Sequence, residues 1–172
     1  MQSIHQHIQI NKKQLSTLIN NRKRLEQLLK NIKYKTQKNQ TFTQKKHHLS
    51  WPIHGKIEQH FGDNIGIAHM QTEAMILAGE PMQLIHAIAA GTVVFSGKLT
   101  GYGSMVIINH GQNYFSIYGY SNKINVKRGQ HLTKGEVIGT VGVNPSNQKY
   151  SLYFGMRHGQ KAINPSDWCH RL

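Results

Sequence analysis

The chain contains little cysteine, few acidic side chains and no long hydrophobic run. Its one cysteine, Cys169, excludes an internal disulfide, so the folded state is expected to depend on core packing. No run of about 18 apolar residues is present, so no membrane-spanning helix is predicted. The first 20 residues lack the apolar centre of a secretory signal, and the sequence alone indicates no route out of the cytoplasm.

The scarcity of acidic residues gives the chain a net charge of +14, and this charge is unevenly distributed. Residues 1–50 hold 11 Lys and Arg against one acidic residue, Glu26, whereas residues 51–172 hold 10 against six. Such a basic segment attracts nucleic acid, anionic lipid or an acidic protein surface. Aromatic side chains that stack on bases are nearly absent from it, which favours a solvated helix followed by a linker, with no nucleic-acid partner.

Residues 1–33 follow a heptad pattern that is typical of an amphipathic helix. Seven of the nine seam positions are apolar, and Asn11 and Arg22 are the exceptions. At about 1.5 Å per residue the helix would be roughly 40 Å long, and its narrow stripe has little to pack against within the chain. We therefore predict a coiled coil with a helix outside these residues. Residues 34–50, rich in Lys, Gln, Thr and His, predict a basic linker.

Residues 51–172 consist of short apolar runs separated by glycine-rich turns. The runs are rich in β-branched and aromatic residues and have the length of strands. Their spacing leaves no room for crossover helices, so the fold class is expected to be mainly β, an antiparallel sheet preceded by the N-terminal helix. The predicted strands are residues 92–95, 104–108, 114–118, 136–141 and 151–154.

The order of seven short motifs resembles the LytM/lysostaphin-type metallopeptidase domain. That resemblance implies a largely antiparallel sheet with a long groove that accommodates peptidoglycan peptides. The motifs are residues 51–57 (WPIHGKI), 61–63 (FGD), 87–97 (AIAAGTVVFSG), 101–111 (GYGSMVIINHG), 126–129 (VKRG), 134–142 (KGEVIGTVG) and 164–168 (NPSDW).

Active members of that family hold zinc with a His, an Asp four residues later, and the second His of a His-x-His strand. Three such ligands leave a coordination position for the water that attacks the peptide. The resemblance places the first two ligands at Thr72 and Ile76 and the His-x-His pair at Ser151 and Tyr153, with a further catalytic histidine at Tyr120. None of these residues is a strong zinc ligand, so we expect no metal cofactor and no catalysis. No relocated site is expected from the other histidines, which include His47, His48, His54, His60 and His69.

The stretch at residues 150–157 (YSLYFGMR), with Tyr118-Gly119-Tyr120 and the helix ahead of the domain, resembles the EnvC-type division factors, which carry degenerate LytM domains. That resemblance implies a non-catalytic activator of N-acetylmuramoyl-L-alanine amidases that split septal peptidoglycan. It also implies a periplasmic location and recruitment by a membrane division complex through the coiled coil. No signal peptide accompanies these features.

In strand 151–154, Leu152 and Phe154 alternate with Ser151 and Tyr153, which places the latter two on one face. Tyrosine combines a large contact area with a polar tip, and arginine pairs with carboxylates, so such a face suits a partner-binding groove. In the alternative interpretation, the tyrosines only fill space vacated by a metal site. Glu73 has no predicted role beside this groove. The predicted groove residues are Ile76, Tyr102, Tyr118, Tyr120, Tyr153 and Arg157.

Two other functions stay open on the sequence. A zinc-dependent peptidoglycan endopeptidase is the enzyme alternative, and zinc bound to the purified protein would favour it. A peptidoglycan-binding or nucleic-acid-associated basic protein is the second alternative. Binding to isolated sacculi would favour the former, and DNA binding that falls steeply with salt would favour the latter.

Overall fold

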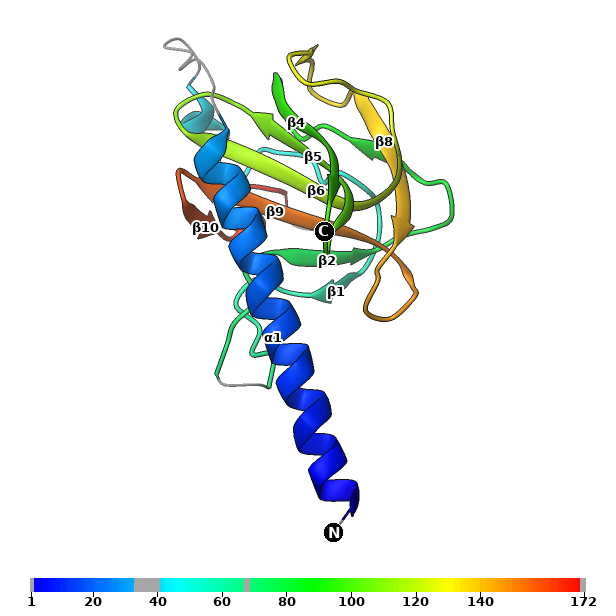
Figure 1. The fold of residues 1–172 in the computed structure, drawn as a ribbon. Helices are drawn as coiled ribbons and strands as arrows, with labels where there is room; N and C mark the ends of the chain where they lie inside the picture. Colours follow the sequence, from blue (N-terminus) through cyan, green and yellow to red (C-terminus); the bar gives the residue numbers. More distant parts are fainter. Residues whose placement is uncertain (1, 33–40, 67–68, 171–172) are drawn as a thin grey trace.

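The computed structural model describes residues 2–32, 41–66 and 69–170. One long helix precedes a β domain, and its N-terminal half projects beyond that domain (Figure 1). None of the described helices has the length and apolar content needed to cross a bilayer. In chain order the elements are α1 (Gln2–Asn31), a 3₁₀ helix (Phe42–Lys45), β1 (Ile57–Gln59), β2 (Met75–Ala78), β3 (Leu84–His86), β4 (Gly91–Leu99), β5 (Gly103–Asn109), β6 (Tyr114–Ile124), β7 (His131–Leu132), β8 (Val137–Val143), β9 (Tyr150–His158), β10 (Lys161–Ile163) and a second 3₁₀ helix (Pro165–Asp167).

In the described part of the chain the strands form one open, antiparallel sheet in the order β1-β2-β9-β8-β6-β5-β4-β7, with β10 beside β9 and β3 beside β8. All five predicted strands are present, as β4, β5, β6, β8 and β9, and the mainly β fold class is confirmed. The strands that the sequence did not predict are β1, β2, β3, β7 and β10. They are two to four residues long, too short for an alternating pattern.

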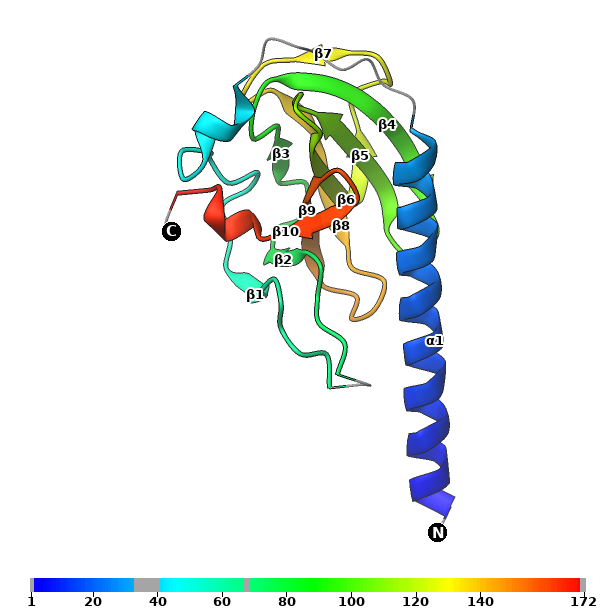
Figure 2. The same ribbon diagram turned by 90° about the vertical axis from the view of Figure 1, so that its left-hand side faces the viewer.

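The long strands carry apolar side chains on both faces. In β5, Val106 and Ile108 face the main core, whereas Met105 and Ile107 face α1. Leu25 and Leu29 of α1 are 1% and 6% exposed because they pack on this second apolar face. Figure 2 shows α1 lying along the β4 and β5 side of the sheet. The expectation that α1 has little to pack against within the chain was therefore wrong for its C-terminal half.

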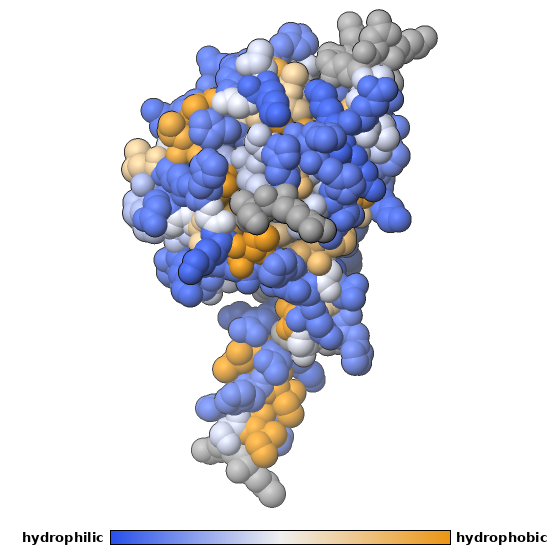
Figure 3. Space-filling view, turned by 180° about the vertical axis from the view of Figure 1, so that it is seen from behind, coloured by the Kyte–Doolittle hydropathy of each residue, from blue (hydrophilic) through white to orange (hydrophobic). Residues whose placement is uncertain are grey.

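The projecting half of α1 keeps its apolar stripe in solvent. Ile4 and Ile8 are 63% and 47% exposed, although they continue the seam that Leu25 and Leu29 bury. Figure 3 shows apolar residues along this part of the helix. The predicted coiled coil through this half, with a helix outside the described residues, stays a prediction.

The predicted linker, residues 34–50, is in part a component of the core. Residues 34–40 lie outside the described residues, but Phe42 is 1% exposed and stacks on the rings of His110 and Trp168, with centroids 4.9 and 5.1 Å away. Leu49 is also 1% exposed and forms a β-bridge with Cys169. The β domain therefore begins before Trp51. The sequence did not predict this, because two isolated apolar residues in a polar segment form no periodic pattern.

Candidate functional site

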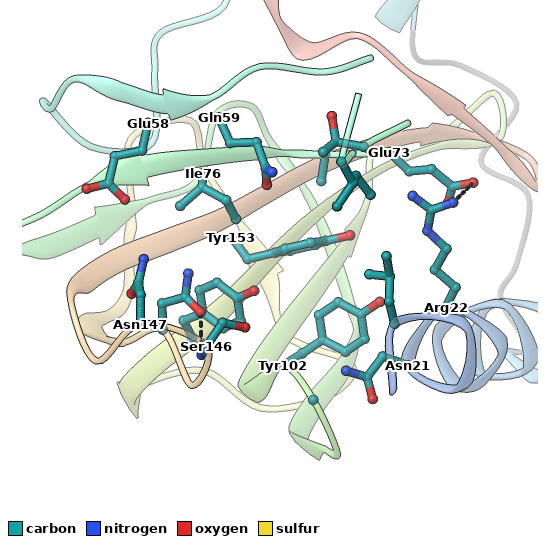
Figure 4. Close-up of a pocket in the computed structure, with 17 residues that line it drawn as sticks. Asn21, Arg22, Glu58, Gln59, Glu73, Ile76, Tyr102, Ser146, Asn147 and Tyr153 are labelled. Carbon is teal, nitrogen blue, oxygen red and sulfur yellow. Dashed lines mark hydrogen bonds and ion pairs between the residues drawn. The ribbon is translucent and has the colours of Figure 1, made fainter. Parts of the chain in front are cut away.

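A pocket of about 400 Å³ lies between α1 and the face of β9 that carries Tyr153. Figure 4 shows Tyr153 near the middle of this pocket, between Ile76 and Tyr102. We call it the tyrosine pocket. Its walls come from α1, β1, β2 and the segment before it, the β4–β5 turn, β6, the loop before β9, and β9. Its lining residues are Leu18, Asn21, Arg22, Glu58, Gln59, Ile65, Thr72, Glu73, Ala74, Ile76, Gly101, Tyr102, Tyr120, Asn144, Ser146, Asn147 and Tyr153.

The three positions to which the family resemblance assigns zinc ligands lie together in this pocket. Ile76 and Tyr153 are paired across β2 and β9, and both line the pocket together with Thr72. The Thr72 hydroxyl donates to the His60 carbonyl oxygen and accepts a hydrogen bond from the Asp63 backbone at 3.0 Å, which holds the turn. The three positions thus form one site, and their side chains supply an alcohol, an alkyl group and a phenol.

The fourth position, Ser151, lies outside the pocket wall. Its side chain is fully buried, and its hydroxyl donates a hydrogen bond to the Glu58 carboxylate over 3.2 Å. In residues 2–32, 41–66 and 69–170 no group of three or more His, Cys, Asp or Glu side chains is placed to hold a metal ion. The residues of the pocket do not fit a zinc ion.

Three tyrosines form the aromatic part of the pocket. The ring of Tyr153 lies edge-on to those of Tyr102 and Tyr120, with centroids 5.0 and 5.7 Å away. Burial raises the pKa of Tyr102 and of Tyr120 to about 12, and burial also raises the pKa of Tyr153 well above its usual value. All three phenols are therefore neutral near pH 7 and can donate hydrogen bonds from an apolar surface.

Tyr118, predicted as a groove residue, lies in the main core instead. Its side chain is fully buried and packs on Phe154. Its hydroxyl accepts a hydrogen bond from the Ile88 backbone at 3.1 Å and lies 2.9 Å from the Ser116 hydroxyl. The groove assignment of Tyr118 was wrong, because the side-chain alternation of β6 changes between Tyr118 and Tyr120.

Arg157 faces a second, adjacent pocket of about 430 Å³ and is only 4% exposed. Its guanidinium donates to a Glu73 carboxylate oxygen at 2.8 Å and to the Gln160 carbonyl oxygen at 3.1 Å. The other Glu73 oxygen lies 3.9 Å from the guanidinium of Arg22 on α1. Glu73, which had no predicted role, thus connects β9 to α1, and Arg157 does not reach the tyrosine pocket.

Several residues that line the tyrosine pocket could not be predicted from the sequence. Leu18, Asn21 and Arg22 come from α1, which was expected to leave the domain free. The turn at Gly101 lies so close to the helix that a Cβ there would be 2.3 Å from the Asn21 side chain. Contacts between segments about 80 residues apart have no local pattern in the sequence, so only the tertiary structure assigns them.

Comparison with protein families identifies the class of this domain. Residues 70–165 match the model of peptidase family M23, which covers the tyrosine pocket positions from Thr72 to Tyr153. The chain therefore belongs to peptidase family M23, and the resemblance to LytM-type domains is confirmed. Two findings are consistent with a degenerate member of this family: relatives that are named as murein hydrolase activators, and no group of metal-binding side chains among the described residues.

Particular relatives narrow the comparison. The chain is similar to murein hydrolase activator EnvC of Escherichia coli K12, with 31% identity over 121 residues, 70% of this chain and 29% of that protein. It is also similar to murein hydrolase activator NlpD of Salmonella dublin, with 34% identity over 116 residues, 67% of this chain and 29% of that protein. The chain thus spans about three tenths of the length of these curated relatives.

Among solved structures, the fold is similar to that of a putative M23 peptidase from Pseudomonas aeruginosa. The TM-score is 0.68 at 22% identity, over 85% of this chain and 60% of that one. This likeness supports the fold alone.

Proposed function

We propose that this protein is a non-catalytic activator of N-acetylmuramoyl-L-alanine amidases in the splitting of septal peptidoglycan, and that it binds them through the tyrosine pocket. One observation carries the proposal. The three positions that hold zinc in active relatives converge on one pocket, yet they carry Thr72, Ile76 and Tyr153. The names of the EnvC and NlpD relatives support murein hydrolase activation as the role.

The chemistry of the pocket suits the binding of a protein segment. Tyr102, Tyr120 and Tyr153 offer apolar area with neutral hydroxyls, as interface anchors do. Asn144, Asn147 and Gln59 add amide groups to the lining of the pocket. A partner segment that places one apolar side chain between the tyrosines and hydrogen-bonds to these amides would fill this surface.

On the basis of the same relatives we also propose a location and further partners for the protein. A protein that acts on septal peptidoglycan works in the periplasm. The exposed stripe around Ile4 and Ile8 on α1 would serve for contact with a membrane division complex, and peptidoglycan itself is a further ligand.

A dye-release assay on labelled sacculi tests this function. The full chain is assayed alone and with a cognate amidase, and Tyr153→Ala is compared with Tyr150→Ala. Tyr150 lies on the same strand but is 42% exposed and does not line the pocket. We expect release only with the amidase, a loss of at least about tenfold in stimulation for Tyr153→Ala, as for an interface anchor, and little change for Tyr150→Ala.

Three outcomes would contradict the proposal. Release by the chain alone that a chelator abolishes would favour the zinc endopeptidase, which family membership makes the main alternative. Equal stimulation by wild type and Tyr153→Ala would contradict binding through the tyrosine pocket, and binding of the wild type to sacculi without any stimulation of the amidase would favour a peptidoglycan-binding protein.

A further inference from the structure

Two carboxylates line the tyrosine pocket, and they differ in how their charge is compensated. The Glu73 carboxylate lies 2.8 Å from the guanidinium of Arg157 and 3.9 Å from that of Arg22. Glu58 takes no part in the ion pairs found in residues 2–32, 41–66 and 69–170. Figure 4 shows Glu58 at one end of the pocket and Arg22 at the other, with Tyr153 between them. The uncompensated negative charge of the pocket therefore lies at its Glu58 end.

Glu58 reaches the pocket from the edge strand β1. The register of β1 against β2 shifts along this strand, and the consecutive residues Glu58 and Gln59 both line the pocket. Ser151, which is fully buried, donates a hydrogen bond from its hydroxyl to the Glu58 carboxylate over 3.2 Å. The lysines adjacent in the chain, Lys56 and Lys149, do not line the pocket. The Glu58 carboxylate is thus held at the pocket wall but stays accessible to a ligand.

The wall beside Glu58 suits a side chain that is apolar along its length and charged at its tip. Figure 4 shows Ile76 between Glu58 and Tyr153, so an aliphatic stem laid along this wall contacts both apolar surfaces. Asn147 adds an amide at the same end. A tyrosine ring also attracts a cation that lies over its face. Lysine and arginine combine an aliphatic stem with a cationic tip, and they are therefore the side chains that fit this end.

We propose that the Glu58 end of the tyrosine pocket receives a lysine or arginine side chain of the protein partner, next to the apolar side chain that the tyrosines enclose. At the opposite end Glu73 already pairs with Arg22 and Arg157, so binding adds an ion pair at the Glu58 end alone. This asymmetry fixes the direction of the partner segment, because a reversed segment would place its cation beside Arg22. The inference rests on the proposed function, since it names the chemistry of the partner segment.

Two capped dipeptides test this charge preference in the full chain without any amidase. Acetyl-leucyl-arginine amide carries the cation, and acetyl-leucyl-citrulline amide is its neutral isostere. In NMR titrations at millimolar concentration, we expect the arginine peptide to shift the amide signals of Glu58, Gln59 and Tyr153. Its affinity should exceed that of the citrulline peptide by about three- to fivefold, and Glu58→Gln should abolish this difference, because a partly exposed ion pair contributes modestly. Asp167→Asn is the matched control, since Asp167 is exposed and lines neither pocket.

The dye-release assay with a cognate amidase tests the same contact in the complex. Glu58→Lys should reduce stimulation at least about tenfold, because it places like charges together, whereas Asp167→Lys changes the net charge equally and should have little effect. Equal affinities for the two peptides, or full stimulation by Glu58→Lys, would overturn the inference. A Glu58-dependent peptide preference without any stimulation by the wild type would support the inference and contradict the proposed function, so the two failures are distinguishable.

Discussion

At the scale of single residues, the alternation of side chains in β6 decides which tyrosines can bind a partner. A regular strand would place Tyr118 and Tyr120 on one face, because side chains repeat every second residue. Tyr120 has a φ of 61°, which is rare for a bulky residue, and the β5–β6 register shifts beside it. Tyr118 therefore points into the core, while Tyr120 lines the pocket.

His110 is the centre of a buried polar chain in the same core. Its Nδ1 lies 2.7 Å from the Ala90 carbonyl oxygen, and its Nε2 lies 2.7 Å from the Ser116 hydroxyl. A carbonyl can only accept, so Nδ1 carries the proton and Nε2 accepts from Ser116. Burial lowers the pKa of His110 from its usual 6.5 to about 4, and the neutral ring fits this arrangement.

This buried histidine predicts a stability that falls on acidification. Between pH 6.5 and about 4, His110 is protonated in the unfolded state but neutral in the folded state. The free energy of unfolding therefore decreases as the pH falls. The contribution is about 3 kcal/mol across that window. Urea unfolding near pH 7 and pH 4.5 measures it. His110→Gln, which does not titrate, should show a shallower pH dependence, and an equal slope would contradict the assignment.

At the scale of elements, α1 uses one apolar stripe for two environments. Its C-terminal half packs on Met105, Ile107, Phe115 and other apolar residues of the sheet, whereas its N-terminal half is exposed. The C-terminal half of the helix takes part in a second hydrophobic cluster and forms one wall of the pocket. The stability of α1 therefore depends on tertiary contacts over its second half only.

Substitutions along this stripe should show that the two halves of α1 contribute differently to stability. Leu25→Ala is expected to cost about 2–4 kcal/mol, because it opens a cavity between α1 and the sheet. Ile8→Ala, at a position that is 47% exposed, should change stability by less than about 0.5 kcal/mol. Urea unfolding followed by helical circular dichroism measures both. Equal effects of the two substitutions would show that α1 does not pack as described.

At the scale of the whole molecule, the two ends of the β domain close on each other. Phe42 packs on Tyr114 and Trp168 as well as His110, and the Trp51 indole donates to the His170 carbonyl oxygen at 2.8 Å. Segments from either side of Trp51 and from the C-terminal region thus share one core. The sheet itself is open, and this closure covers the face opposite α1.

Closure of the domain predicts that residues before Trp51 are essential to its stability. Phe42→Ala should cost about 3–5 kcal/mol, because a fully buried ring is lost from a stacked aromatic group. Thr43→Ala, next to it and exposed, removes only a hydrogen bond to Gln112 and should cost about 1 kcal/mol. Thermal unfolding of the full chain compares the two. Matching melting temperatures would mean that residues 41–50 are a linker after all.

The sequence by itself determined the long helix, the five longer strands and the family. Period-two alternation placed Tyr153 and Leu152 on opposite faces of β9, heptad spacing predicted α1, and short motifs predicted the M23-type sheet. These features are local, since each depends on residues within a few positions of one another.

Only the tertiary structure decided which residues from distant parts of the sequence are in contact. It placed Tyr118 in the core, fastened α1 to the sheet, and set Glu73 between Arg22 and Arg157. The reason is physical. A side chain's partner across the fold depends on the register, a left-handed residue and the burial of distant segments, none of which leaves a periodic trace in the chain.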